Sequence, residues 1–218
     1  MFIGHFGVGL ASKKISQLPS LAILFIAVQF LDLIWPIFVL TGIETFTIEE
    51  GITKLTPLNF THYPYSHSLM MSLVWALLFG LVYFLFTKQK GNSVLIAGLV
   101  FSHWILDFIT HRPDLALSPF SDYKVGLGLW NYPIAEVILE VGLFLIGVYF
   151  YVTVVKPKRK IAFWLLITSF LVIHIMNLLS PPPPSIEAVA WSANLMWIFI
   201  IWAWWIERGH KTTLSTHS

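Results

Sequence analysis

The sequence contains no cysteine and few charged residues. Of its 218 residues only 11% are Asp, Glu, Lys or Arg, whereas 57% are hydrophobic, and the mean hydropathy is +0.78. Because there is no cysteine, any metal would be held by histidine nitrogens and carboxylate oxygens. The scarcity of charge excludes a soluble domain of this size and indicates an integral membrane protein made of spans and short loops.

Two further absences narrow the class of protein. The net charge of only +2 gives no support for nucleic-acid binding. No convincing internal repeat is present, so an inverted-repeat transporter gains no support either.

Long apolar stretches recur along the chain, each near the roughly 20 residues that a bilayer requires. They lie at 21–40, 68–87, 93–111, 132–155, 161–179 and 188–206. The segment 1–12 is apolar but too short to span, which predicts a re-entrant or partly inserted helix. We therefore predict an all-α polytopic membrane helix bundle of about six spans, forming one domain over 1–208, with a disordered tail at 209–218. The loop 42–61 is expected to contain a short surface helix.

The basic residues are distributed unequally between the two sides that these spans define. One side receives ten of them, namely Lys13, Lys14, Lys88, Lys90, Lys156, Lys158, Arg159, Lys160, Arg208 and Lys211. The other receives three, namely Lys54, Arg112 and Lys124. By the positive-inside rule the first side is cytoplasmic. This distribution predicts that both termini lie inside, and the expected location is a bacterial or archaeal cytoplasmic membrane.

The stretch 101–114, FSHWILDFITHRPD, places ionisable residues in a segment otherwise apolar enough to span. On a helix His103, Asp107 and His111 form a single polar stripe, because a four-residue step advances about 40° around the axis. An aspartate inside a span is costly and is expected to face a cation, a metal or a protein partner.

Other polar residues are predicted to lie in the same outward half of the membrane. Imidazole and carboxylate groups suit zinc, manganese or iron. The candidate metal ligands are His5, Asp32, His62, His67, His103 and Asp107. For each residue a structural role is the alternative, such as a hydrogen bond that fastens two spans.

The order of these residues resembles the bacterial family of inner-membrane-associated metal-dependent hydrolases. The elements that carry the resemblance are Gly4-His5, Asp32 followed by Pro36, His62-x4-His67-Ser68, and Ser102-His103-x3-Asp107. The resemblance covers about the first half of the chain and implies a divalent metal, with zinc foremost. It also implies hydrolysis, distantly related to that of zinc-dependent phospholipase C.

The sequence departs from the family pattern at three positions. Ile34 and Trp35 stand where the family has a second aspartate and a histidine, and Tyr63 stands where it has arginine. Two possible ligands are therefore missing, which makes a dinuclear site less expected.

The leading functional hypothesis is a membrane-embedded metal-dependent hydrolase that acts on a phospholipid or another amphiphilic phosphoester at the outer side of the membrane. Asp32 or Glu140 would act as the base, and Arg112, Lys124 and His111 would bind the substrate. For Glu136 and Glu140, which are one turn apart, the alternative to a direct catalytic role is to support the site or to pair with Arg112 and Lys124. The alternatives are a proton or divalent-cation transporter or channel, and a non-enzymatic membrane protein whose polar cluster locks the helices together.

Overall fold

The computed structural model describes residues 1–208 and consists chiefly of long helices. Six are long and apolar enough to cross a membrane: α2 (Leu21–Leu40), α4 (Leu69–Thr87), α5 (Lys90–Thr110), α6 (Pro133–Val154), α7 (Lys160–Leu179) and the helix Ile186–Glu207. The last is interrupted at Leu195 into α8 (Ile186–Asn194) and α9 (Met196–Glu207). The predicted all-α polytopic bundle is confirmed. The predicted tail at 209–218 lies outside the described residues.

The first helix, α1 (Ile3–Ala11), is buried inside the bundle. Its nine residues are too few to span a bilayer. It packs against α6 at the closest point, where a Cβ on Gly7 would lie 2.6 Å from the carbonyl oxygen of Leu143. Gly147 of α6 faces Gly7 in the same way, so both helices need glycine for their backbones to meet.

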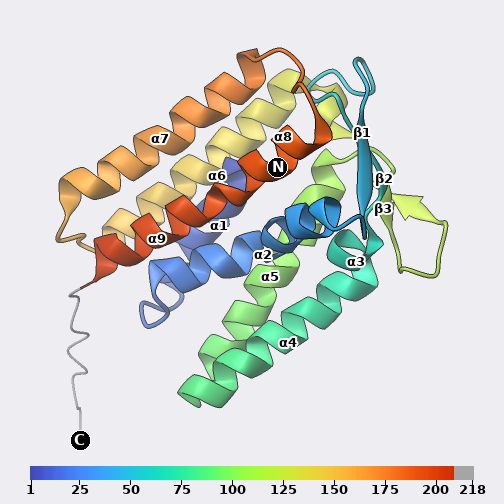
Figure 1. Ribbon diagram of the computed structural model, residues 1–218. Helices are drawn as coiled ribbons and strands as arrows, with labels where there is room; N and C mark the ends of the chain where they lie inside the picture. The colour runs from blue at the N-terminus through green and yellow to red at the C-terminus, as the bar shows by residue number, and fades with distance from the viewer. Residues whose placement is uncertain (209–218) are drawn as a thin grey trace, which may run out of the picture.

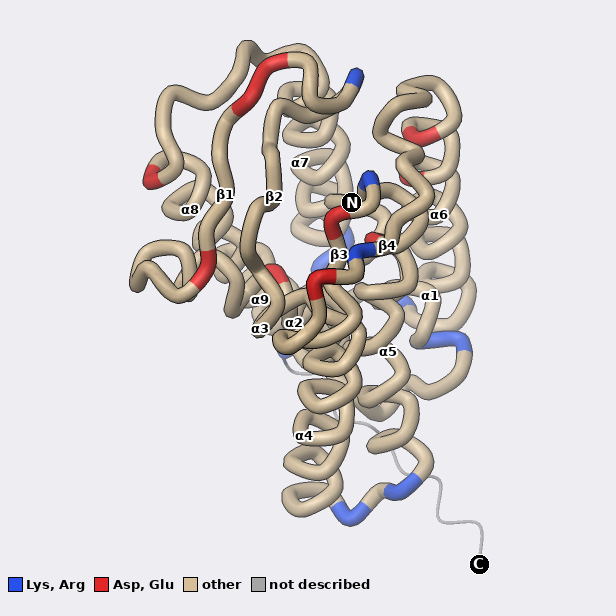
Figure 2. The backbone as a smooth tube through the Cα atoms, turned by 90° about the vertical axis from the view of Figure 1, so that its right-hand side faces the viewer, with Lys and Arg blue, Asp and Glu red and all other residues tan. Residues whose placement is uncertain are grey.

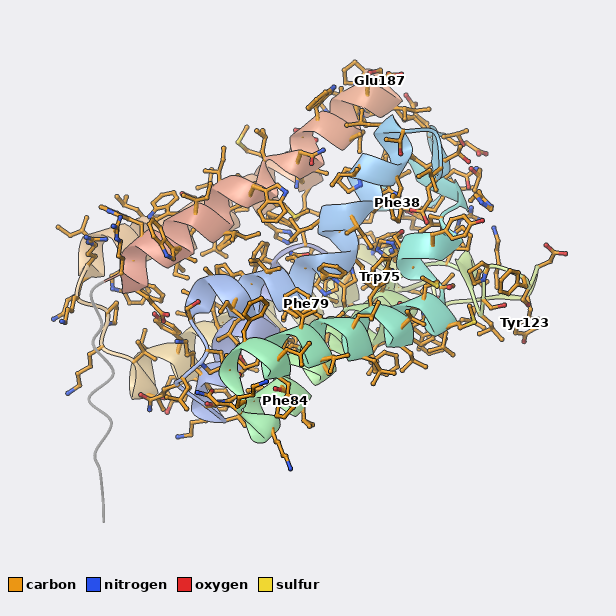
Figure 3. All side chains as sticks on the ribbon, turned by 60° about the horizontal axis from the view of Figure 1, so that its bottom comes forward. Phe38, Trp75, Phe79, Phe84, Tyr123 and Glu187 are labelled. Atoms are coloured by element: carbon orange, nitrogen blue, oxygen red, sulfur yellow. The ribbon has the colours of Figure 1, made fainter. Side chains whose placement is uncertain are left out.

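Two apolar cores share α2 between them. One core is formed with α1, α6, α7 and α9, and includes Phe25 of α2; the other is formed with α4 and α5, and includes Val28 of α2. Figure 1 shows α6, α7 and α9 on one side of α2 and α4 with α5 on the other. Trp75 and Phe79 of α4 point towards α2 (Figure 3), where the ring of Phe30 lies 5.6 and 5.2 Å from theirs. The central position of α2 therefore places its polar residues at the junction of both halves.

Short strands, rather than the expected surface helix, occupy the segment between α2 and α4. β1 (Thr45–Ile48) pairs antiparallel with β2 (Leu58–His62). In β1 the side chain of Phe46 is buried between the exposed Thr45 and Thr47, which is the period-two pattern of a strand with one buried face. The expectation of a helix was wrong because Phe46 packs with Phe60 on the aromatic ring of Trp35.

The remaining elements are short and lie in the connections. They are η1 (Ser12–Lys14), α3 (Pro64–His67), β3 (Leu115–Ala116), β4 (Lys124–Val125) and η2 (Leu129–Asn131). β3 pairs antiparallel with β4. Both strand pairs lie at one end of the bundle, whereas basic residues occupy the turn from α4 to α5 at the other end (Figure 2).

Candidate metal centre

Five of the predicted ligands meet at the junction of the two cores. They come from four helices that are far apart in the sequence: His5 from α1, Asp32 from α2, His67 from α3, and His103 and Asp107 from α5. Their possible ligand atoms form two compact groups, one of His5, His103 and Asp107 and one of Asp32, His67 and His103. Within each group these atoms all lie within 4.8 Å of one another.

Asp107 is the central residue of this cluster and is only 2% exposed. Its Oδ2 atom lies 3.0 Å from Nε2 of His103 and 3.7 Å from Nε2 of His67. Its Oδ1 atom lies 3.2 Å from Nε2 of His5 and 3.2 Å from the amino nitrogen of Met1. The two oxygens of one carboxylate thus face different histidines.

Asp32, in α2, lies close to two of these histidines, His67 and His103. Its Oδ1 atom lies 3.3 Å from Nε2 of His67 and 3.7 Å from Nε2 of His103. Its side chain is 27% exposed, whereas those of the two histidines are 5% exposed or less. Asp32 is therefore the most exposed member of this group, and it lines the cavity beside it.

His103 is held in one orientation by the backbone of α2. Its Nδ1 atom lies 2.7 Å from the carbonyl oxygen of Val28, which can only accept a hydrogen bond. The proton therefore lies on Nδ1, and in the neutral ring Nε2 carries a lone pair. Nε2 is buried and has no hydrogen-bond partner among the described residues.

His67 is oriented by a chain of two polar side chains. Its Nδ1 atom lies 2.7 Å from Oγ of Ser66, and this hydroxyl donates to Oε2 of Glu44 at 2.6 Å. Glu44 also accepts from the backbone amides of Tyr65 and Ser66, both at 2.8 Å. Burial raises the pKa of the Glu44 carboxyl, and the hydrogen bonds from Ser66 oppose that rise. Nε2 of His67 is thereby directed at Asp32 and Asp107.

This arrangement of atoms fits a divalent metal ion. In the neutral ring, Nε2 of His103 and the Oδ2 atom of Asp107 would both be acceptors, and two acceptors 3.0 Å apart repel each other unless a cation or a further proton lies between them. Histidines that ligate metals typically donate their other ring N–H to a carbonyl or carboxylate, which is the role of Val28 for His103. The donor set of nitrogen and oxygen atoms suits zinc.

A second group extends the cluster towards the surface. Nε2 of His111 lies 3.9 Å from Oδ1 of Asp107, and its Nδ1 lies 3.0 Å from Oδ1 of Asp114. Tyr63 donates its hydroxyl to the same Asp114 oxygen at 2.6 Å. Burial and the Asp114 carboxylate raise the pKa of the Tyr63 hydroxyl well above its usual value, so it remains a donor. His111 is thus held between two aspartates, with the ring of Trp130 4.0 Å from its own.

Four other predicted site residues lie outside this cluster. His62 is exposed at the end of β2 and stacks edge-on with Tyr65. Arg112 pairs with Asp114 at 3.4 Å and donates to Asn59, and Lys124 donates to the carbonyl oxygen of Thr61. The fourth, Glu140, accepts hydrogen bonds from backbone amides at the start of α1.

The residues that sequence reasoning did not select are Glu44, Ser66 and Asp114. Glu44 is 22 positions from Ser66, and the β1–β2 hairpin brings them together. Asp114 follows the end of α5, where helical spacing no longer predicts which way a side chain points. For Ser66 and Asp114 the available signal was a polar side chain close to His67 and to Arg112 in the sequence, whereas Glu44 offered no such signal.

A cavity of about 1240 Å³ opens beside the cluster. Asp32, His67, Asp107 and His111 line one part of it. Apolar residues of α7, α8 and α9 line another part, among them Ile173, Leu178, Val189, Met196 and Phe199. The cavity therefore joins a polar site to an apolar surface between helices.

The fold and the site together define a polytopic helical membrane protein with a buried cluster of histidines and aspartates. The sequence model of the YdjM inner membrane protein family matches residues 3–180, and the chain belongs to this family. No curated protein and no solved structure matches the chain.

Proposed function

We propose that this protein is a metal-dependent hydrolase whose centre lies within the membrane. The observation that carries the proposal is the buried Nε2 of His103, which faces Asp107 while Nδ1 is committed to the carbonyl oxygen of Val28. A metal ion would satisfy this atom and would also offset the cost of a charged aspartate inside the bundle.

His103 and Asp107 would hold the ion, with His5 on the Oδ1 side of Asp107 and His67 on the Oδ2 side. The structural alternative, in which a second proton on His103 forms an ion pair with Asp107, explains one contact. It does not explain why His67 is also directed at the same carboxylate by Ser66 and Glu44. Two oriented histidines at one carboxylate favour a shared ion, and zinc suits these ligands.

When bound, such an ion would supply Lewis acidity for hydrolysis at neutral pH. Asp32 contacts both oriented histidines and also meets the cavity, so it is placed to accept a proton from water. The Oε1 atom of Glu140, the other predicted base, is engaged by the amides of Phe2 and Gly4. The geometry therefore favours Asp32 as the base.

The shape of the cavity supports an amphiphilic substrate. A phosphoester at the cluster would leave its hydrocarbon part against the apolar residues of α7, α8 and α9, without leaving the membrane. Lys54 also lines the cavity and is the basic side chain placed to contact the phosphate. By the charge distribution of the loops, this end of the bundle would face outwards.

The test combines metal content with turnover. Purified protein in detergent is expected to contain about one zinc per chain and to release a phosphorylated head group from short-chain phospholipids. Chelation is expected to abolish release, and added zinc to restore it. Protein that contains the metal but turns over no phosphoester would contradict the hydrolase. Zinc or proton flux into proteoliposomes under those conditions would favour a transporter instead.

A further inference from the structure

A second group of polar residues lines the same cavity and takes no part in the metal centre. Glu136 of α6 is fully buried, and neither of its carboxylate oxygens has a hydrogen-bond partner in the described chain. The next residue along the same face of α6 is a second acid, Glu140, which supplies no positive charge. A buried carboxylate without a partner is costly, so a ligand that supplies positive charge and hydrogen bonds would stabilise Glu136 in its charged form.

The neighbours of Glu136, which are Glu140 and His174, supply no cation for it and have polar atoms of their own that are free to bind a ligand. Oε1 of Glu140 accepts from the backbone of α1, whereas its Oε2 lies 3.9 Å from Nδ1 of His174. Nε2 of His174 is buried and has no hydrogen-bond partner among the described residues. All three side chains line the cavity that also contains Asp32 and Asp107. They therefore offer several unused polar atoms to one ligand.

The spacing of these atoms distinguishes between possible cations. Within residues 1–208, the groups whose ligand atoms all lie within 4.8 Å of one another involve His5, Asp32, His67, His103 and Asp107. Glu136, Glu140 and His174 form no such group, so they are too widely spaced to share a bare metal ion. A protonated amine hydrogen-bonds its acceptors at about 2.8–3.0 Å, farther than a metal ion lies from its ligands, and can donate to two of these groups without contacting all three.

The kind of amine follows from the hydrogen-bond donors that the two Glu136 oxygens lack. A primary ammonium group has three N–H donors, which can reach separate carboxylate oxygens. A quaternary ammonium group has none and is typically held by an aromatic cage. Acidic residues also predominate among the charged groups of the cavity: Asp32, Glu50, Asp107, Glu136 and Glu140 stand against Lys54 and the amino group of Met1, which is already paired with Asp107. The lining therefore favours a ligand with a primary amine.

We propose that Glu136, with Glu140 and His174, forms a subsite for the primary ammonium of the substrate's head group. The proposal rests on the proposed hydrolase and names its substrate class, an amphiphilic phosphoester with a primary amine, as in an ethanolamine phospholipid. The phosphate lies towards the metal centre, the amine lies against α6 and α7, and the acyl chains lie between the apolar helices.

The experiment compares three phospholipids that share short acyl chains and differ in their head groups: ethanolamine, choline and glycerol. Binding to the purified full chain is measured by native mass spectrometry, and hydrolysis is measured in parallel. Wild type is expected to bind the ethanolamine lipid at least tenfold more tightly than either of the others. In Glu136→Gln the preference is expected to fall to within twofold. The matched control is Glu187→Gln, which changes an exposed carboxylate in the first turn of α8 (Figure 3) and is expected to retain the preference.

The outcomes separate this subsite from the proposed activity. Selective binding of the ethanolamine lipid without hydrolysis would support the subsite and contradict the hydrolase. Hydrolysis of all three lipids without preference would support the hydrolase and overturn the subsite. Equal binding of the choline lipid would overturn the assignment to a primary amine, as would a preference that survives in Glu136→Gln.

Discussion

The Nδ1 atom of His103 in α5 lies 2.7 Å from the carbonyl oxygen of Val28 in α2. This contact joins a predicted metal ligand to the helix that both cores share. It fixes the imidazole ring so that Nε2 faces Asp107. No feature of α5 alone would ensure this orientation of the ring. The centre therefore depends on the packing of α2 against α5 as well as on the ligands themselves.

Replacing His103 by alanine is expected to remove the bound metal, because the ring supplies one nitrogen ligand and separates Asp107 from the backbone of α2. Zinc measured by elemental analysis of the purified protein should fall from about one per chain to less than a tenth of that. His62→Ala is expected to retain the metal, since His62 is exposed at the end of β2. Equal metal content in His103→Ala and wild type would remove the basis of the proposed centre.

The hydroxyl of Ser66 is predicted to tune the centre without touching it. Ser66→Ala removes the group that links Nδ1 of His67 to Glu44, so the ring loses its fixed orientation. Loss of such an outer partner typically weakens metal binding by about 10- to 100-fold. Zinc affinity is measured by competition with a chromophoric chelator.

The control for this change is Ser169→Ala, because the Ser169 hydroxyl only donates to Leu165 within α7. It is expected to bind zinc as wild type does. An unchanged affinity in Ser66→Ala would show that the Glu44–Ser66–His67 chain does not act on the ion.

Much of this fold follows from simple properties of the sequence. The apolar stretches are long enough to span, and composition alone predicts the bundle with boundaries close to those observed. Within the site, spacing places His103 and Asp107 on one face of α5, and the cost of a charge in a span requires that Asp32 find partners.

The remaining features depend on tertiary contacts that the sequence does not encode locally. His62 and His67 are equivalent as sequence signals, yet only His67 follows the turn at Pro64 into the bundle, directly before Ser68, which caps α4. The hairpin that carries Glu44 is stabilised by packing of Phe46 on Trp35 from a different helix. Arg112 and Lys124 have the charge to bind phosphate, but each is engaged by a group from the β1–β2 hairpin that becomes a neighbour only in the fold, Asn59 for Arg112 and the carbonyl oxygen of Thr61 for Lys124.

Tyr63 is predicted to stabilise the entrance of the site. Its hydroxyl donates to the buried Asp114 at 2.6 Å, and a hydrogen bond to a charged group typically contributes about 1.5–3 kcal/mol. Tyr63→Phe should therefore lower the free energy of unfolding by about that amount, measured by denaturant titration in detergent micelles. Tyr149→Phe changes an exposed ring of α6 and serves as the control. Equal losses in both variants would contradict a specific role for the Asp114 contact.

At the opposite end of the bundle, Lys13 and Glu207 form a buried ion pair at 2.8 Å. Glu207 also accepts from the amide of Leu21 and the hydroxyl of Tyr151, so the pair joins η1 to the ends of α2, α6 and α9. Removing one partner of a buried pair typically costs about 3–5 kcal/mol, because the other charge is left uncompensated. Lys13→Met should destabilise the protein by this amount in the same unfolding assay.

Two further variants separate the effect of the pair from that of charge in general. Lys14→Met alters an exposed neighbour and should leave stability within about 0.5 kcal/mol of wild type. Adding Glu207→Gln to Lys13→Met should recover part of the loss, since the orphaned charge is then removed. A strictly additive double variant would show that the two residues do not stabilise each other.

The absence of native cysteine allows a direct test of the proposed orientation. Asp122→Cys places a thiol in the exposed loop between α5 and α6, on the side of the metal centre, and Lys156→Cys places one in the exposed turn between α6 and α7. If the centre faces outwards, a membrane-impermeant maleimide should label Cys at 122 in intact cells and should label Cys at 156 only after permeabilisation. The reverse pattern would place the cavity on the cytoplasmic side, and its substrate would then have to come from the inner leaflet.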